Sequence, residues 1–466
     1  MYRMVDGAIL RQLTDIVGPK AVFSDEETLT IYSKDETIGI SHKPEVVVKP
    51  TTPKEIKEIM RLSYLENIPL TPRGKGTGLS GGAIPIYGGI VLSCENMERI
   101  IDIDNDNLMV ITEPGIITGQ LQKTVEAQNL FYPPDPASLD SCSIGGNVAE
   151  CAGGSRAVKY GTTKDYVNGL ELILPSGVMI STGGKVVKDV TGYNLTQLIT
   201  GSEGTLAIIT QIILRLIPLP RLRKDMLIPF NSIEQAAQTV SDIIRSQIVP
   251  TAIEIMEKNS FELAELFTKR TLPFRDASAH LLVTLDGNQE EALDEEQTRV
   301  GEICERNGAI DILIASSRTM RERMWEGRKC LFEAANLMGK MYKPFDVVVP
   351  RSLIPSLIKK IYEISEKYKI KAMCFGHAGD GNVHVLIFQG EIPNDEWGNK
   401  IEIIERELYK STINLGGKIT AEHGVGLLRK PFLSMNLDSQ QIELLKGLKK
   451  VFDPKNILNP GKIFDL

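Results

Sequence analysis

The sequence predicts an α+β protein of two or three domains, and three observations lead to that prediction. The chain has 466 residues, which corresponds to two or three domains of ordinary size. Its first half is rich in glycine and short apolar runs, whereas strands alternate with long charged helices after about residue 218. The apolar content of 42% and the charged content of 24% are those of a globular protein.

Composition excludes several classes of protein. The net charge of −7 gives little support to nucleic-acid binding. The six cysteines form no Cys-x-x-Cys pair, so we expect neither an iron–sulfur cluster nor a disulfide framework. The N-terminus lacks the apolar core of a signal peptide, and no segment approaches the roughly 20 apolar residues of a membrane span. We therefore expect a cytoplasmic enzyme in a reducing compartment.

The elements expected in the first half follow from apolar runs and turn residues. Residues 1–41 are expected to form a helical, polar lead-in. Thr52-Pro53 should open an amphipathic helix that runs to about Asn67, because proline suits the first helical position. A Pro-Ser-Gly turn predicts a hairpin of strands 170–174 and 178–182. Further strands are expected at 46–48, 90–93, 100–103, 108–112 and 205–213, with a helix at 118–130.

The second half predicts a separate α+β domain. Its expected strands are 226–228, 252–256, 281–285, 310–315 and 346–349, and its expected helices are 233–246, 260–268, 289–307, 319–339 and 353–368. The predicted domain plan is a lead-in at 1–41, a first domain at 42–218, a second domain at 219–415, and a C-terminal segment at 416–466. We expect that last segment to pack back on the first domain.

Two histidines flank a stretch that reads as a turn, His377-Ala-Gly-Asp-Gly-Asn-Val-His384. A two-residue turn at Asp380-Gly381 would place the two imidazoles directly opposite each other, with Cβ atoms about 4.5–5.5 Å apart. Glu422 and His423 follow about forty residues later, so these motifs hold three of the five histidines. Three protein ligands with an open position are typical of a catalytic metal site, and His377, His384 and Glu422 could supply them. The alternative is a hairpin whose histidines serve packing only.

The glycines of residues 73–82 need an explanation of their own. Gly76, Gly78 and Gly81 fit the G-x-G-x-x-G pattern, but Pro85 and Gly88-Gly89 follow where a Rossmann site requires a helix. We therefore reject the Rossmann interpretation. Five glycines with one arginine and one lysine suit a loop of N–H groups around an anion. Similar loops at 143–155 and 201–204 favour a long ligand with a central pyrophosphate over simple tight turns.

These loops resemble the FAD-binding domain of the vanillyl-alcohol oxidase/p-cresol methylhydroxylase (PCMH) superfamily. The matching segments are Pro72-Arg-Gly-Lys-Gly-Thr-Gly-Leu-Ser80, Pro134-Asp-Pro-Ala-Ser138, Ser143-Ile-Gly-Gly-Asn147, Gly161-Thr-Thr163, Ser202-Glu-Gly-Thr205, Gly376-His-Ala-Gly-Asp-Gly-Asn-Val-His384, Glu422-His-Gly-Val-Gly426 and Asn459-Pro-Gly-Lys462. The resemblance implies a two-subdomain FAD-binding domain of the PCMH type and an α+β cap domain with an antiparallel sheet. Within the superfamily the chain looks like the FAD-dependent D-2-hydroxyacid dehydrogenases, most of all the lactate dehydrogenase subunit that pairs with electron transfer flavoprotein.

The resemblance also assigns roles to residues. His377, His384 and Glu422 would bind one divalent metal ion, zinc by preference over iron or manganese, and His423 would act as the base. Arg328 and Lys343 would bind the substrate carboxylate. FAD would be non-covalent, since Ala83 stands where some relatives attach it through a histidine. The FAD-binding positions would be Pro72, Arg73, Gly74, Lys75, Gly76, Thr77, Gly78, Leu79, Ser80, Pro134, Asp135, Ser138, Ser141, Ser143, Ile144, Gly145, Gly146, Asn147, Gly153, Gly154, Gly161, Thr162, Glu203, Gly204, Ile209, Asn382 and Asn459.

The expected reaction is oxidation of a D-2-hydroxyacid, D-lactate by preference, to the 2-oxoacid by hydride transfer to flavin. The ordinary pKa of an imidazole, about 6.5, suits His423 to accept the hydroxyl proton. Relatives that oxidise the five-carbon diacid carry asparagine where this chain has Leu386, which favours a smaller substrate. Electrons would pass to electron transfer flavoprotein or, second, to an iron–sulfur subunit. The alternatives are a glycolate oxidase subunit, a D-2-hydroxyglutarate dehydrogenase, a flavin-free metal-dependent hydrolase and a non-catalytic FAD-binding subunit.

Overall fold

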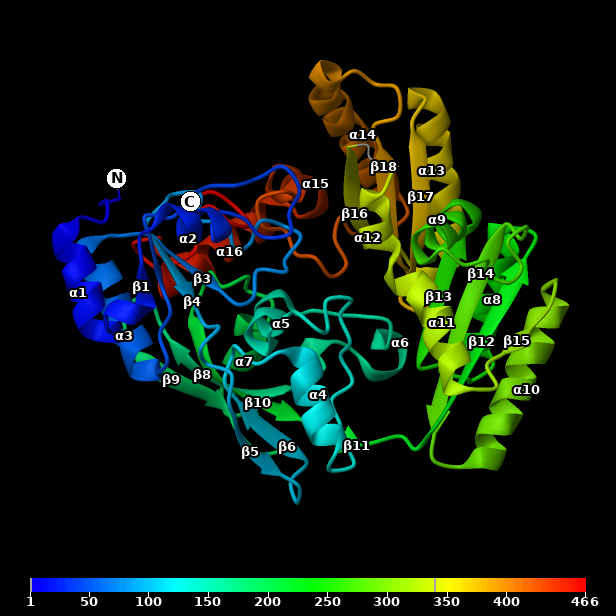
Figure 1. Ribbon diagram of the computed structural model, residues 1–466, viewed down its shortest axis with the longest axis horizontal. Helices are drawn as coiled ribbons and strands as arrows, with labels where there is room; N and C mark the ends of the chain where they lie inside the picture. The colour runs from blue at the N-terminus through cyan, green and yellow to red at the C-terminus, as the bar shows by residue number, and fades with distance from the viewer. Residues whose placement is uncertain (1, 339–340) are drawn as a thin grey trace. The chain divides into compact units, whose positions relative to one another are not determined.

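The computed structural model describes residues 2–338 and 341–466, which fall into two units (Figure 1). Unit 1 contains the chain up to Gly153, Thr162–Leu219 and Glu422–Leu466. Unit 2 contains Gly154–Gly161 and Pro220–Ala421. The predicted α+β class is confirmed, because both units combine helices with antiparallel sheets.

The helices and strands have the following bounds. Unit 1 contains α1 (Gly7–Val17), β1 (Val22–Phe23), α2 (Glu26–Ile31), β2 (Val46–Val48), α3 (Pro53–Glu66), β3 (Leu70–Arg73), β4 (Ile90–Ser93), β5 (Ile100–Asp104), β6 (Met109–Thr112), α4 (Thr118–Glu126), β7 (Leu130–Phe131), α5 (Ile144–Glu150), β8 (Val167–Ile173), β9 (Met179–Gly183), α7 (Leu195–Ile199), β10 (Ile208–Arg215), β11 (Ile217–Pro218), α15 (Leu433–Asn436) and α16 (Ser439–Phe452). Unit 2 contains α6 (Ala157–Tyr160), β12 (Leu222–Phe230), α8 (Ile233–Arg245), β13 (Ala252–Glu257), α9 (Lys258–Thr268), β14 (Ala279–Gly287), α10 (Glu290–Arg306), β15 (Leu313–Ile314), α11 (Arg318–Lys329), α12 (Leu331–Asn336), β16 (Tyr342–Val348), α13 (Ile354–Tyr368), β17 (Lys371–His377), β18 (Asn382–Phe388) and α14 (Asn394–Asn414).

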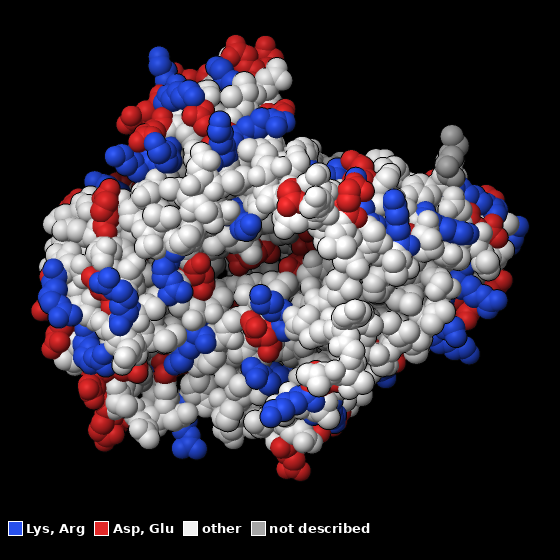
Figure 2. Space-filling model, turned by 180° about the vertical axis from the view of Figure 1, so that it is seen from behind, with Lys and Arg blue, Asp and Glu red and all other residues white. Residues whose placement is uncertain are grey.

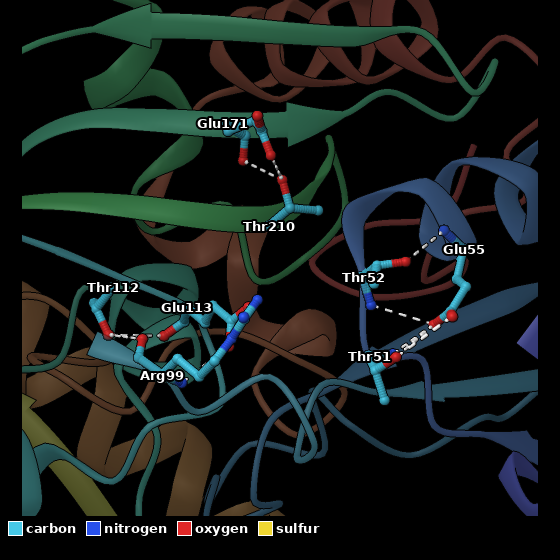
Figure 3. A network of polar contacts seen from close by, with 8 residues as sticks. All are labelled: Thr51, Thr52, Glu55, Arg99, Thr112, Glu113, Glu171 and Thr210. Carbon is cyan, nitrogen blue, oxygen red and sulfur yellow. Dashed lines mark hydrogen bonds and ion pairs between the residues drawn. The ribbon is translucent and has the colours of Figure 1, made fainter. Parts of the chain in front are cut away.

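The first sheet of unit 1 has the order β1-β2-β4-β3, and its last three strands are parallel. Helices α1 and α3 bury side chains such as Ile9 and Ile59 in one core with Val46 and Leu92 of the sheet. The predicted start of α3 is confirmed: Thr52 and Glu55 form a capping box, drawn in Figure 3, ahead of a first turn that holds the proline. A capping box satisfies N–H groups that the first helical turn leaves unpaired.

The second sheet of unit 1 is antiparallel, with the order β5-β6-β10-β8-β9. The predicted Pro-Ser-Gly hairpin is confirmed as β8–β9, in which Leu170 pairs with Thr182. Figure 3 also shows the hydroxyl of Thr210 on β10 donating to the carboxylate of Glu171 on β8, 2.7 Å away. Side-chain bonds of this kind tie neighbouring strands together beyond the backbone ladder.

The C-terminal segment returns to unit 1, as predicted. The N–H of Leu70 on β3 donates to the carbonyl oxygen of Ile457, and the N–H of Asn459 donates to that of Leu70, both at 2.7 Å. The buried ammonium of Lys449 on α16 donates to the carboxylate of Asp453 at 2.5 Å. These contacts make the tail an additional layer beside β3, the strand from which the glycine-rich loop departs.

Unit 2 is built on one antiparallel sheet with the order β15-β12-β14-β13-β17-β18-β16. Helices α9, α11 and α12 pack on one face, where Phe261, Leu331 and Phe375 share a core. The opposite face meets α14, because Phe345 of β16 contacts Tyr409 of that helix. The layer that contains α14 continues through α13, α8 and α10 (Figure 1).

Several expected elements of the second half differ in the structure. The single helix expected at 319–339 divides into α11 and α12 at Cys330, and residue 339 lies outside the described residues. The strand expected at 310–315 contains only Leu313–Ile314. Strands β12 and β14 are longer than expected, because their polar ends pair over Leu222–Phe230 and Ala279–Gly287. Apolar runs underestimated the lengths of these strands, because charged residues occupy their ends.

The surface carries both signs of charge. On the face drawn in Figure 2, lysines and arginines are interspersed with aspartates and glutamates, which agrees with the modest net charge. None of the helices in the described part of the chain combines the length and the hydropathy that a membrane crossing requires.

Candidate active site

The loop after β3 in unit 1 presents unpaired hydrogen-bond donors. From Gly74 to Ser80, no backbone N–H group donates a hydrogen bond to another described residue. The hydroxyl of Ser80 is also buried without a partner among the described residues. Lys75, in the same loop, forms no ion pair with the described residues. A run of free N–H groups beside a cation suits an anionic ligand, as predicted from the glycines.

The N-terminal segment holds this loop in place. The guanidinium of Arg73 donates to the carbonyl oxygen of Lys34 at 2.7 Å and lies over the ring of Tyr32. The N–H of Glu36 donates to the carbonyl oxygen of Gly78 at 3.1 Å. A Cβ atom at Gly76, whose φ is +72°, would overlap the Arg73 guanidinium. Sequence reasoning missed this role of residues 32–36, because they carry no motif and lie in the expected polar lead-in.

The second loop, Ser143–Asn147, is the first turn of α5. Ser143 caps the helix by accepting from the N–H of Gly146, while the N–H of Gly145 donates to the carbonyl oxygen of Pro114 at 2.7 Å. A Cβ atom at Gly145 would lie 2.5 Å from that of Pro114, so close packing accounts for this glycine. The second loop therefore differs from the first, since its amide groups are paired within the protein.

Glu203, in the third loop, ties distant segments of unit 1 together. Its buried carboxylate accepts from the N–H groups of Val425 and Gly426, both at 2.7 Å. Asn459 donates from its amide to the carbonyl oxygens of Glu203 and Gly82, at 2.8 and 2.9 Å. These two residues, which the resemblance places at the cofactor, thus hold the loop that carries Glu422 and His423. Ile209 is a core residue of β10.

Glu150 is a further acidic residue near these loops that sequence reasoning missed. A Cβ atom at Gly82 would lie 2.9 Å from its carboxylate, and one at Gly424 would lie 2.5 Å from it. Burial raises the pKa of Glu150 well above its usual value, and the carboxylates of Glu203 and Asp35 add to the effect. Burial also raises the pKa of Glu203. The hydrogen bonds that its carboxylate accepts from two backbone N–H groups act in the opposite direction and lower the pKa.

The remaining flavin positions expected in the first domain fall in both units. The carbonyl oxygen of Pro134 accepts from the side-chain amide of Gln122 at 2.8 Å, which secures the segment that leads to Asp135, Ser138 and Ser141. Gly153 lies in unit 1, where its Cβ atom would be 2.9 Å from the carboxylate of Glu422. Gly154 and Gly161, which were also expected to bind the flavin, belong to unit 2.

The segment Gly154–Gly161 is anchored within unit 2. The ammonium of Lys159 lies 2.5 Å from the carboxylate of Asp286 at the end of β14, and the hydroxyl of Tyr160 donates to the same carboxylate at 2.9 Å. The φ angles of Gly154 and Gly161 are +134° and +80°, so both ends of this excursion use conformations that favour glycine. Thr162 begins the return to unit 1.

The histidine hairpin of unit 2 forms from β17 and β18, but its predicted register is wrong. His384 pairs with Phe375, whereas His377 pairs with Glu254 of β13 on the other side of β17. The reason is the loop, which spans the four residues 378–381 instead of two; the N–H of Asp380 donates to the carbonyl oxygen of His377 at 3.0 Å. A slip of two residues preserves the face on which each side chain lies. The two imidazole centroids are therefore still only 5.2 Å apart.

Polar side chains from four strands line this face of the sheet. Glu254 on β13 lies 2.6 Å from Nδ1 of His377 on β17. Asp346 on β16 pairs directly with His384 on β18, and its carboxylate lies 3.8 Å from Nδ1 of that histidine. Arg328 reaches the row from α11, with Nε 2.7 Å from the Glu254 carboxylate and the guanidinium 4.9 Å from the ring centroid of Phe375.

The carboxylate of Glu254 stays ionised in this buried position. Burial by itself would raise the pKa of Glu254, but the adjacent His377 imidazole and Arg328 guanidinium outweigh it and hold the pKa below its usual value. A carboxylate is an acceptor only, so Nδ1 of His377 carries the proton and donates it. In the neutral form of His377, this tautomer directs the lone pair of Nε2 outward, the arrangement in which a histidine binds a metal ion.

The chain passes from this row directly to Glu422 and His423. The hydroxyl of Thr420 and the N–H of Ala421 donate to the Asp346 carboxylate, at 3.0 and 2.9 Å, at the last residues of unit 2. Within unit 2, the ligand atoms of Asp346 and His384 lie within 4.8 Å of one another. Within unit 1, Nε2 of His423 lies 3.7 Å from the Glu422 carboxylate. Imidazole nitrogens with carboxylate oxygens are donors that suit zinc, iron or manganese.

Two of the expected site residues have other partners. Lys343 forms an ion pair with Glu405 of α14 and lies on the face of β16 opposite to Asp346, so the structure does not bring it to the histidines. Asn382 lies on the same face as His384, and its amide donates to Asp346 at 2.8 Å. Of the two expected cations, only Arg328 lies in the polar row.

Two family models match the chain. The model described as FAD binding domain matches residues 44–183, and the one described as FAD linked oxidases, C-terminal domain, matches residues 219–463, more than half of the chain. The chain belongs to the FAD-linked oxidases. In this FAD-linked oxidase, the loop of free N–H groups, Gly74–Ser80, belongs to unit 1.

Known relatives extend over the full length of this FAD-linked oxidase. It is 40% identical to the glycolate oxidase subunit GlcD of Bacillus subtilis, with 99% of this chain and 97% of the relative covered. It is 35% identical to a D-lactate dehydrogenase of Anaerostipes hadrus, with 99% and 98% covered. The structure of p-cresol methylhydroxylase aligns with a TM-score of 0.81 over 99% and 98% of the two chains at 18% identity, which confirms the PCMH-type fold.

Proposed function

We propose that this FAD-linked oxidase is a metal-dependent D-2-hydroxyacid dehydrogenase and that D-lactate is its substrate. The observation that carries the proposal is the row of His377, His384 and Arg328 on one face of the unit 2 sheet. Such a row offers metal donors beside a cation, which a substrate with adjacent hydroxyl and carboxylate groups requires. The name of the D-lactate dehydrogenase relative agrees with this chemistry.

FAD is held non-covalently by the loop from Pro72 to Ser80, whose free N–H groups and Lys75 fit a pyrophosphate. The buried Ser80 hydroxyl adds a further group in need of a partner. Ala83 offers no atom to which flavin could be attached. Bound FAD supplies the hydride acceptor for the reaction.

The chain's own residues bind the substrate and move its proton. Arg328 holds the substrate carboxylate, because a guanidinium can donate two parallel hydrogen bonds to it. His423 accepts the hydroxyl proton. His377, His384 and Glu422 hold the divalent cation, zinc by preference over iron or manganese, and such a cation makes a hydroxyl group more acidic.

The side chains near the histidines favour a small substrate. Leu386 follows His384 by two residues on β18, faces the same side of the sheet and is buried in an apolar core. An apolar side chain offers no hydrogen bond to a second carboxylate. Glycolate is the second candidate, because the Bacillus relative is named a glycolate oxidase subunit. D-2-hydroxyglutarate would need a polar group that Leu386 does not provide.

The electrons leave to another protein. Electron transfer flavoprotein is the proposed acceptor and an iron–sulfur subunit is the second candidate. Support comes from the cysteines: all six are free, and five of them are buried, so they do not form a cluster site.

The proposal is tested by mixing the purified, flavin-loaded protein anaerobically with D-lactate, L-lactate, glycolate or D-2-hydroxyglutarate and following flavin absorbance. D-lactate should bleach the flavin fastest, and metal analysis of the same sample should find about one divalent ion per chain. A colourless protein would favour the metal-dependent hydrolase. A yellow protein that no hydroxyacid bleaches would indicate a subunit that only binds FAD.

The H423A variant tests the role of His423 as the base. H423A should retain FAD, but the substrate should reduce this flavin about 10²–10⁴-fold more slowly. This factor is the usual contribution of a general base. H42A is the matched control, since His42 is an exposed histidine of the same unit. Full activity of H423A would contradict the assignment.

A further inference from the structure

We infer that Glu254 is the positioning residue that prepares both the metal ligand His377 and the substrate-binding Arg328. The inference rests on the proposed function and extends it to a residue of β13 that no motif identifies. The Glu254 side chain is fully buried, and its two oxygens have different partners. Oε1 lies 2.6 Å from Nδ1 of His377, and Oε2 lies 2.7 Å from Nε of Arg328.

Toward the metal, Glu254 selects one form of His377. By accepting the Nδ1 proton it leaves Nε2 with the lone pair that a metal ion needs, and it fixes the orientation of the ring. Removal of such a partner typically weakens metal binding 10–100-fold. For His384, the carboxylate of Asp346 lies 3.8 Å from Nδ1.

Toward the substrate, Glu254 occupies one edge of the Arg328 guanidinium and leaves the rest available. Nη2 of Arg328 is buried and has no hydrogen-bond partner among the described residues. A buried guanidinium nitrogen without a partner is costly, so a carboxylate that binds there is favoured. Glu254 and the ring of Phe375 hold the guanidinium plane from two sides, which orients the free nitrogen before the substrate arrives.

One carboxylate thus serves two binding events. Oε1 accepts the hydrogen bond of His377 Nδ1, whereas Oε2 forms an ion pair with Arg328 in which Nε and Oε2 do not have hydrogen-bond geometry. Both partners are positively polarised, so both contacts need an oxygen. An amide at this position has one acceptor oxygen and one NH₂ group, and the NH₂ group would face a donor. The E254Q variant must therefore lose either the contact with His377 or the contact with Arg328, while keeping nearly the same shape.

The test compares E254Q with E257Q in the flavin-loaded, full-length protein. Glu257 is a buried glutamate of the same strand whose carboxylate accepts from the N–H groups of Asn259 and Cys374, away from the row. We expect E254Q to bind Zn²⁺ 10–100-fold more weakly in competition with a chromophoric chelator, or to show at least a tenfold higher KM for D-lactate at saturating Zn²⁺. E257Q should change neither quantity more than about twofold.

The outcomes separate the inference from the proposed function. A wild-type protein that binds no divalent ion and whose flavin no hydroxyacid reduces would overturn the proposed function. A wild-type protein that does both, with E254Q unchanged in Zn²⁺ affinity and KM, would overturn the inference alone. If E254Q does not fold, E254D takes its place: it keeps the charge, shortens the reach by one methylene, and should show smaller losses in the same two quantities. Unchanged values for E254D would then overturn the inference.

Discussion

Single buried acids decide much of the chemistry of this protein, and they differ in how their charge is compensated. Glu254 has a cationic partner and a hydrogen-bond donor, so its pKa falls below the usual value in spite of burial. Glu150 has neighbouring carboxylates instead, and burial raises its pKa. The guanidinium of Arg429 acts against this rise in the pKa of Glu150. These two glutamates thus have opposite tendencies to ionise.

The raised pKa of Glu150 predicts that unit 1 loses stability at high pH. The folded form holds the Glu150 proton more tightly than the unfolded form, so stability falls as the pH rises from about 4.3 toward the raised pKa. E150Q removes this loss and should release its flavin at a higher temperature than the wild type at pH 8. Each kcal/mol corresponds to about 2–4 °C for a unit of this size.

The measurement is the temperature of flavin release as a function of pH. The advantage of E150Q should shrink as the pH is lowered toward the usual glutamate pKa of about 4.3, because the glutamate of the unfolded wild-type chain then binds the same proton. E98Q is the control, since Glu98 is an exposed glutamate of the same unit. Parallel pH profiles for E150Q and the wild type would contradict the prediction.

Among the elements, the β17–β18 hairpin shows how turn length controls a site. Its four-residue loop shifts the partner of His384 from His377 to Phe375, yet both histidines keep the same face. On its other edge, β17 pairs with β13, where His377 lies opposite Glu254. The hairpin is closed at Gly376, where a Cβ atom would overlap the carbonyl oxygen of Asn382 and lie 3.0 Å from Cα of Val383.

A methyl group at Gly376 should therefore force the two strands apart. We expect G376A to destabilise unit 2 by about 2–3 kcal/mol, because backbone atoms cannot move aside as a flexible side chain would. It should also weaken Zn²⁺ binding, since His377 is the next residue. Urea unfolding followed by tryptophan fluorescence measures the first effect, and chelator competition measures the second.

The control for G376A is G398A. Gly398 lies within α14, and no atom lies within 4 Å of its added Cβ, so alanine should be neutral or stabilise the helix by up to about 1 kcal/mol. Equal stabilities of G376A and G398A would show that the hairpin tolerates the methyl group.

For the molecule as a whole, the two units have separate cores and separate spectroscopic reporters. Both tryptophans, Trp325 and Trp397, belong to unit 2, whereas the loop proposed to bind FAD belongs to unit 1. Trp325 donates to Asp225 at 2.7 Å, and Trp397 is a buried residue of α14. Tryptophan fluorescence should thus report on unit 2, and flavin fluorescence on unit 1.

This division predicts different responses to the two ligands. FAD at 100 times its Kd should stabilise the flavin-reported transition by about 2.7 kcal/mol, whereas Zn²⁺, whose proposed ligands come from both units, should stabilise both transitions. Removal of the metal with a chelator should abolish flavin reduction by D-lactate while FAD stays bound. Equal shifts of both transitions by FAD would show that the units unfold as one.

The local pattern of the chain was sufficient for many elements and for the choice of chemistry. Apolar runs predicted β2 and β4 with the observed bounds, and the Thr52-Pro53 pair predicted the start of α3. The alternation of side chains along a strand placed His377 and His384 on one face even though the register was wrong. These features depend on residues close in sequence, whose periods and turn preferences act over a few positions.

Other features of the site depend on contacts between distant residues. Glu254 lies 123 residues before His377 and meets it only because β13 is the neighbour of β17 in the sheet. Lys343 resembled a substrate-binding cation in sequence, but the pleat of β16 turns it toward Glu405 on the opposite face. Glu203 and Asn459 matched ligand-binding motifs and also hold loops together. Strand order and packing against helices are set by the burial of whole faces, which short motifs do not encode.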